Sequence, residues 1–127
     1  MKAALRRAWV WLPALGWAGT IWFVSSRRVD AVHLPGPSDK VIHFFVFAFL
    51  ALLLGRALRY EWSAERMTRA AVVAALIAAV YGGVDEIHQS FVPGRFCQGS
   101  DFIADLLGAC VAAWAFRRHT SRAVARD

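Results

Sequence analysis

Charged residues are scarce in this chain, and cysteines are scarcer still. Asp, Glu, Lys and Arg make up 19% of the 127 residues and hydrophobic residues 58%, against about 25% and about 45–50% in soluble domains. A water-soluble globule is therefore not expected. The two cysteines, Cys97 and Cys110, are too few and too poorly matched to form a disulfide framework or a zinc finger.

What the chain does contain is typical of a protein in contact with lipid. It has six Trp and nine Phe, and its mean hydropathy is +0.43. Its net charge of +6 would favour nucleic acid as the partner of a soluble protein, but the Arg residues stand in short runs between apolar stretches. That pattern sets membrane topology instead. We therefore expect an integral membrane protein and no nucleic-acid partner.

Four segments approach the roughly 20 apolar residues that a membrane-spanning helix needs. The first follows basic residues as a signal peptide does, but it lacks a good cleavage site and is interpreted as an uncleaved span. The sequence thus predicts an all-α membrane protein, a four-helix transmembrane bundle forming a single domain over 1–127. The predicted spans cover about 9–26, 41–58, 70–91 and 101–116.

The basic residues predict the orientation of the bundle. Eleven of the 15 Lys and Arg residues fall at the amino end, between the second and third spans, and in the carboxyl tail. Because basic residues concentrate on the cytoplasmic side, we expect both termini in the cytoplasm. The basic residues left on the outer side are Arg27, Arg28, Lys40 and Arg95.

Polar residues complete three of the predicted helices at their outer ends. The third apolar run, 70–84, is too short to cross the membrane, so its helix should continue to about Phe91. The short connection that follows contains a Pro-Gly turn and forces the third and fourth helices into an antiparallel hairpin. Ser38 and Ser100 are expected as N-caps of the second and fourth helices.

These polar side chains should converge at one depth in the outer leaflet. A charge at the centre of a spanning helix costs roughly 2.5–3.5 kcal/mol, less near the interface, and such groups usually pair or line a wet cavity. The alternative is that they only hold the helices together. The candidate ligand-binding residues are Asp39, Lys40, His43, Asp85, Glu86, Gln89, Arg95 and Asp101.

Several of these residues leave alternatives open. His43 and His88 lack a metal-binding spacing and are each expected to hydrogen-bond to a carboxylate, so neither a metal nor another cofactor is predicted. Arg95 could hold a phosphate or carboxylate in its guanidinium fork, or form a salt bridge with Asp101 or Glu86. The candidate catalytic residues, as acid, base or proton carrier, are Asp85, Glu86 and His88.

Three motifs follow one another in the chain. They are Asp39-Lys40-x-x-His43, then Gly82-x-x-Asp85-Glu86-x-x-Gln89-x-Phe91-x-Pro93-Gly94-Arg95, then Asp101 with Gly108. Over about residues 17–115 the chain thereby resembles the VanZ-like family of small bacterial membrane proteins, named after a protein associated with teicoplanin resistance. The resemblance implies a multi-pass protein of the bacterial cytoplasmic membrane that acts at its outer face. Because the family commonly has Asn where this chain has Asp105, it implies no role for Asp105.

Three functions fit these features. A binding protein would recognise a lipid headgroup, a lipid-linked cell-wall precursor or a lipoglycopeptide without covalent chemistry. A membrane-embedded enzyme would use the carboxylates and histidines as acid and base on a lipid-linked substrate, although no nucleophile motif is present. A proton-coupled transporter would need a homo-oligomer, because four short helices without an internal repeat offer no path.

Overall fold

The chain folds into four long helices. A computed structural model of the protein describes residues 2–27, 37–62, 66–95 and 97–124. The helices are α1 (Lys2–Ser25), α2 (Pro37–Glu61), α3 (Met67–Gln89) and α4 (Gly99–Val124), and the described residues contain no strand. The prediction of an all-α, four-helix fold is confirmed.

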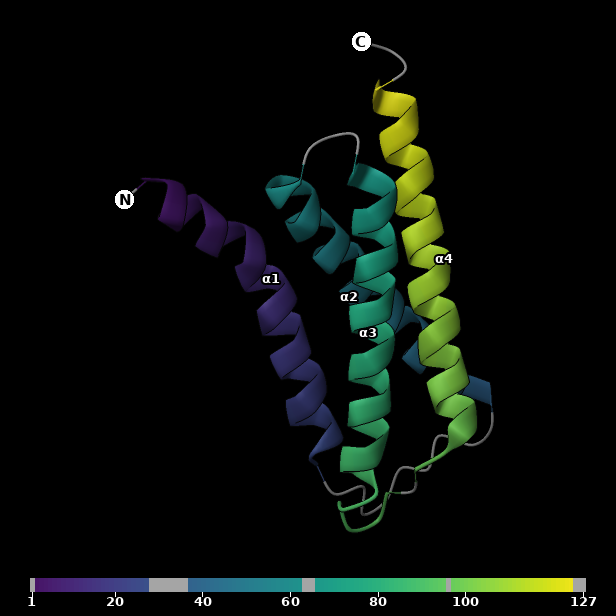
Figure 1. The fold of residues 1–127 in the computed structure, drawn as a ribbon. Helices are drawn as coiled ribbons and strands as arrows, with labels where there is room; N and C mark the ends of the chain where they lie inside the picture. Colours follow the sequence, from purple (N-terminus) through teal and green to yellow (C-terminus); the bar gives the residue numbers. More distant parts are fainter. Residues whose placement is uncertain (1, 28–36, 63–65, 96, 125–127) are drawn as a thin grey trace.

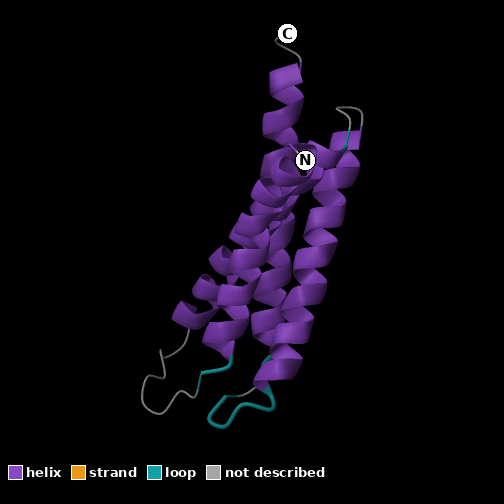
Figure 2. Cartoon of the chain, turned by 90° about the vertical axis from the view of Figure 1, so that its left-hand side faces the viewer, coloured by secondary structure: helices purple, strands orange, loops and turns teal. Residues whose placement is uncertain are grey.

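Successive helices run in opposite directions. α1 begins and α4 ends at the same end of the bundle, and α3 and α4 form the predicted antiparallel pair (Figure 1). Figure 2 shows the same bundle from its side. At the opposite end α1 and α3 end and α2 and α4 begin. We call this the polar end, because it holds the buried polar residues Ser25, Asp85, Glu86, Gln89, Asp101 and Asp105.

α2 lies at the centre of the bundle. Its Phe47 and Leu50 are buried, and it packs against both α3 and α4. The approach of α4 to α2 requires a glycine, because a Cβ on Gly108 would collide with the backbone carbonyl of Phe44. Small residues let membrane helices pack closely in this way. On α3 the same role falls to a row of fully buried alanines, Ala70, Ala74 and Ala78.

α1 is held less closely than the other three helices. Two hydrogen bonds fix its middle: the Trp17 indole N–H donates to the carbonyl of Val46 (3.0 Å), and the Tyr81 hydroxyl donates to the carbonyl of Ala18 (2.7 Å). Towards its amino end α1 leans away from the bundle (Figure 1). Pro13 lies in that half of the helix, and a proline inside a helix removes a hydrogen bond and bends the axis.

Three of the helices are long and apolar enough to cross a membrane. Large apolar side chains such as Phe45 and Val80 are about two-thirds exposed on their outer faces (65% and 67%), which suits lipid rather than water. The chain is therefore a multi-pass membrane protein. That α1 also crosses, and that both termini face the cytoplasm, stay predictions. The three spans are Ser38–Glu61, Thr68–Gln89 and Gly99–His119.

The end of α3 comes slightly earlier than the sequence predicts. The helix ends at Gln89, and as far as Val92 the chain continues in tighter turns whose N–H groups bond to carbonyls three residues back. Pro93 disfavours helical geometry in the residue before it. The turn then passes through Gly94, whose φ of 86° favours glycine.

The predicted N-caps are wrong. α2 begins at Pro37 and α4 at Gly99, so Ser38 and Ser100 lie inside the first turns rather than before them. Proline is favoured as the first residue of a helix because the N–H that it lacks would have no partner there.

Candidate functional site

The polar end gathers side chains from all four helices. Its six buried polar residues are each at most 5% exposed, although the helices around them are apolar. Buried polar groups are costly in this setting unless they bond to one another or to a ligand. Their bonding partners therefore show what the site can do.

His43 and Asp105 form the centre of the cluster. The Nδ1 atom of His43, on α2, lies 2.9 Å from Oδ1 of Asp105, on α4, and Asp105 is completely buried. The carboxylate fits because α3 carries Gly82 opposite it: a Cβ at Gly82 would lie only 2.9 Å from Oδ2 of Asp105. The expectation that His43 bonds to a carboxylate is confirmed.

Glu86 brings a second buried carboxylate to the same point. Its Oε2 accepts a hydrogen bond from the backbone N–H of Gln98 (3.0 Å), and its Oε1 lies 3.9 Å from Nδ1 of His43. Two carboxylate oxygens in the cluster, Glu86 Oε1 and Asp105 Oδ2, are buried and have no hydrogen-bond partner within the described part of the chain. Buried oxygens rarely stay unpaired, so this part of the site is open to a proton or a ligand.

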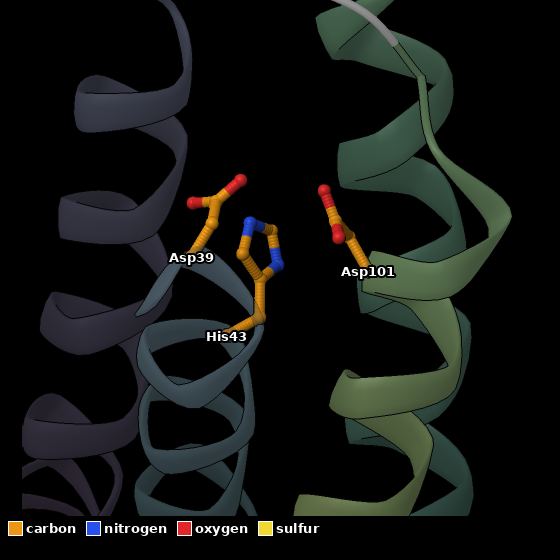
Figure 3. A group of neighbouring side chains, drawn as sticks. All are labelled: Asp39, His43 and Asp101. Carbon is orange, nitrogen blue, oxygen red and sulfur yellow. The ribbon is translucent and has the colours of Figure 1, made fainter. Parts of the chain in front are cut away.

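Asp39 and Asp101 lie close to His43, and Lys40 pairs with Asp101. Figure 3 shows the imidazole between the carboxylates of Asp39, on α2, and Asp101, on α4. Lys40 donates to Oδ1 of Asp101 (3.2 Å) and so links the first turns of α2 and α4. The predicted convergence of helix two with the carboxylates of helix four is confirmed.

Asp85 faces the other way, toward α1. Its Oδ1 accepts from the Ser25 hydroxyl (2.6 Å) and its Oδ2 from the side-chain amide of Gln89 (2.9 Å). Asp85 and Gln89 stand one helical turn apart, as their spacing predicts. Ser25 is not among the site residues predicted from the sequence. The one feature of the sequence that could have indicated it is its position as a serine at the end of an apolar run.

Arg95 binds at the end of α1 and forms neither of the salt bridges considered for it. Its guanidinium donates to the carbonyls of Val24 (3.1 Å) and Arg27 (3.2 Å) and to Oε1 of Gln89 (3.3 Å). The last carbonyls of a helix have no partners within it and carry partial negative charge. These carbonyls accept hydrogen bonds from the guanidinium, and the alternative of a salt bridge with Asp101 or Glu86 is not found among the described residues.

His88 also differs from expectation. Its Nε2 lies 2.9 Å from the Ser26 hydroxyl, and its ring stacks on Trp22 with 3.9 Å between centroids. Its hydrogen-bond partner is thus a hydroxyl of the chain just beyond α1 and not a carboxylate. His88 and Asp85 therefore both face the end of α1, whereas Glu86, the third candidate catalytic residue, lies near His43 of α2.

A pocket of about 260 Å³ lies between α1, α2 and α3. Its inner wall is apolar and includes Trp17, Ile21, Val46 and Phe47. Toward the polar end, Val24 and Ile42 are joined in the lining by side chains that bond or carry charge: Ser25, Asp39, His43, Asp85, Gln89 and Arg95. Most of the predicted ligand-binding residues thus face one pocket, while Lys40, Glu86 and Asp101 lie outside its lining.

In the described ranges of the chain, two sets of side chains have a geometry suited to a metal ion. In each, one potential ligand atom per residue lies within 4.8 Å of the others. Neither set is visible as a sequence motif, because each combines residues from two or three helices. The sets are Asp39 with His43 and Asp101, and His43 with Glu86 and Asp105.

Comparisons with known proteins agree with the resemblance seen in the motifs. A protein of fission yeast, Schizosaccharomyces pombe, described as uncharacterized, is 38% identical over 91 residues, which cover 70% of this chain and 53% of that protein. The chain thus spans about half the length of this curated relative. No solved structure matches. The model of the VanZ/LLP1 family matches residues 7–121, nearly the whole chain, and the protein therefore belongs to the VanZ/LLP1 family.

Proposed function

We propose that this protein binds the polar headgroup of a membrane lipid at the polar end of its bundle. The observation that carries the proposal is the change of character along the pocket between α1, α2 and α3. The lining is largely apolar toward the middle of the bundle, and its charged and most of its polar residues lie toward the polar end. A lipid has the same gradient, from acyl chain to headgroup.

The pocket's charges favour a headgroup that carries both an amine and a phosphate. Asp39 offers a carboxylate in the lining, to which an amine can bind. Arg95 has five N–H donors and uses them on three acceptors of the chain. A phosphate can accept from those that remain, since a guanidinium binds phosphate in a bidentate manner.

The size of the pocket narrows the class of ligand. At about 260 Å³ it is somewhat smaller than typical pockets for drug-sized molecules, which span about 300–1,000 Å³. It can take a headgroup, whereas an intact lipoglycopeptide is far too large. The relative in fission yeast also supports a ligand that bacterial and eukaryotic membranes share, and phosphatidylethanolamine is the best match.

Titration with short-chain lipids tests this proposal. The full chain in detergent is titrated with soluble phosphatidylethanolamine, phosphatidylcholine and phosphatidylglycerol. We expect the first to bind tightest and Asp39→Asn to weaken it about tenfold, as the loss of a charged hydrogen bond predicts. The matched control is Glu61→Gln, which also removes one acid but lies at the other end of the bundle, paired with Arg7 (3.1 Å). Equal binding of all three lipids, or equal loss in both variants, would contradict the proposal.

The proposal extends to a role at the envelope of a bacterial cell, where the outer leaflet also holds lipid-linked wall precursors. A protein that holds headgroups there would alter the access of teicoplanin to its target. Expression of the wild-type chain in a sensitive host should then raise the tolerance of that host to teicoplanin more than its tolerance to vancomycin. Expression of Asp39→Asn at matched membrane levels should not. If both strains are equally susceptible to teicoplanin, headgroup binding does not protect the cell against this antibiotic.

A second candidate function, acid–base catalysis, rests on a separate observation. His43 bonds to Asp105 at 2.9 Å with Glu86 beside it, and such a pair can take up and release a proton. In that case Glu86→Gln would abolish turnover of a lipid-linked substrate in reconstituted vesicles. A Glu86→Gln protein with full turnover would exclude Glu86 from such chemistry.

A further inference from the structure

We propose that His43, Glu86 and Asp105 form a binding site for a divalent transition-metal ion behind the wall of the pocket. One potential ligand atom of each residue lies within 4.8 Å of the other two. The three residues come from α2, α3 and α4, so a bound ion would join the three helices that span the membrane.

Two oxygen atoms in this group have no hydrogen-bond partner among the residues that the structure describes. Glu86 Oε1 and Asp105 Oδ2 are buried and accept no hydrogen bond, and their residues are 3% and 0% exposed. A buried carboxylate oxygen without a donor is costly. A coordinated cation would satisfy both oxygens at once. The two carboxylates cannot satisfy each other, because both are acceptors with the same charge.

The surrounding charges also call for a cation. Lys40 is engaged by Asp101, and Arg95 donates to Gln89 and to backbone carbonyls near the end of α1. Among the described residues, neither Glu86 nor Asp105 has a lysine or arginine partner. Two acids and one imidazole thus share a low-dielectric space, where a divalent ion would neutralise both carboxylates.

The donor set indicates which ions fit. One imidazole nitrogen with two carboxylate oxygens suits Zn²⁺ or Mn²⁺. An all-oxygen set would instead favour Mg²⁺ or Ca²⁺. No thiol contributes, because Cys97 and Cys110 are both exposed and lie outside the group. The ion would displace the proton that His43 and Asp105 share, since a ligand nitrogen must be unprotonated.

This site is distinct from the headgroup proposal. Glu86 and Asp105 do not line the pocket, and only His43 belongs to both. Metal binding can therefore hold while headgroup binding fails, or the reverse.

The test measures bound metal directly. The full chain in lipid nanodiscs is stripped with a chelator, equilibrated with Zn²⁺ or Mn²⁺, desalted and analysed by inductively coupled plasma mass spectrometry. We expect about one ion per chain and a higher Tm with the ion than without it. Glu86→Gln and Asp105→Asn should each weaken binding by at least about tenfold, whereas Glu61→Gln should bind like the wild type.

Two results would overturn the proposal: the wild type retains neither ion, or both site variants retain as much of the ion as the wild type. Because a variant can fail to fold, X-ray absorption at the metal edge of the wild-type protein gives a second measurement. One nitrogen with oxygen ligands is the expected coordination. Sulfur ligands, or oxygen ligands alone, would place the ion elsewhere.

Discussion

The imidazole of His43, on α2, bonds to the fully buried carboxylate of Asp105, on α4, at 2.9 Å. The two residues are 62 positions apart in the chain, yet they form the centre of the polar end. A buried carboxylate with a single imidazole partner depends strongly on that partner. The pair is therefore the most sensitive point of the cluster.

Replacing His43 should destabilise the protein severely. In His43→Leu the carboxylate of Asp105 stays buried without its partner, and we expect a loss of about 3 kcal/mol or more in the free energy of unfolding. The control is His88→Leu, which removes a histidine bonded to the hydroxyl of Ser26 and should cost about 1 kcal/mol. Reversible unfolding in mixed micelles measures both. Equal losses would mean that the contact with Asp105 has no special weight.

Neighbouring glycines on α3 should respond in opposite ways to the same substitution. A Cβ at Gly82 would lie 2.9 Å from Oδ2 of Asp105, whereas at Gly83 the nearest atom is 3.5 Å away, on the ring of Phe102. Gly82→Ala should therefore cost about 1–3 kcal/mol through overpacking. Gly83→Ala should be neutral or stabilising by up to about 1 kcal/mol, because alanine favours the helix.

Thermal unfolding of the two alanine variants in parallel checks this prediction. Metal retention gives a second readout, because only the Gly82 substitution presses on Asp105. If Gly82→Ala is as stable as Gly83→Ala, the packing of α3 against the buried carboxylate is looser than the structure indicates.

Orientation in the membrane can be read from the two cysteines. Cys97 is exposed at the polar end, and Cys110 lies within the apolar span of α4. If the polar end faces outward, a membrane-impermeant maleimide should label Cys97 in intact cells. Cys110 should resist it, because thiols react as thiolates and lipid disfavours that charge. Cys97→Ser gives the background signal, and labelling only after permeabilisation would reverse the predicted orientation.

The sequence predicts the fold more completely than the site. The apolar segments and the short third connection are enough to give the helices and the α3–α4 hairpin, because these depend on local hydrophobicity and turn chemistry. The partners of Arg95 and His88 depend instead on where the end of α1 lies. That position is set by contacts such as Trp17 with Val46, which a linear pattern does not show.

Asp105 is a second example of a contact between helices that the sequence does not show. Its spacing from Asp101 places both on one helical face, but spacing alone does not show that Asp105 is buried against Gly82 and bonded to His43. Ser25 is similar, since its bond to Asp85 joins residues 60 positions apart. Pairings across helices need the packing of the whole bundle, whereas the polar residues themselves are visible in the sequence.

Native mass spectrometry of the full chain tests headgroup binding most directly. The protein is released from nanodiscs containing equal amounts of phosphatidylethanolamine, phosphatidylcholine and phosphatidylglycerol, and the lipids that stay bound are identified by mass. We predict that the wild type and Glu61→Gln retain one phosphatidylethanolamine preferentially and that Asp39→Asn loses this preference. Retention of the three lipids in equal amounts by all three proteins would contradict a headgroup site at the polar end.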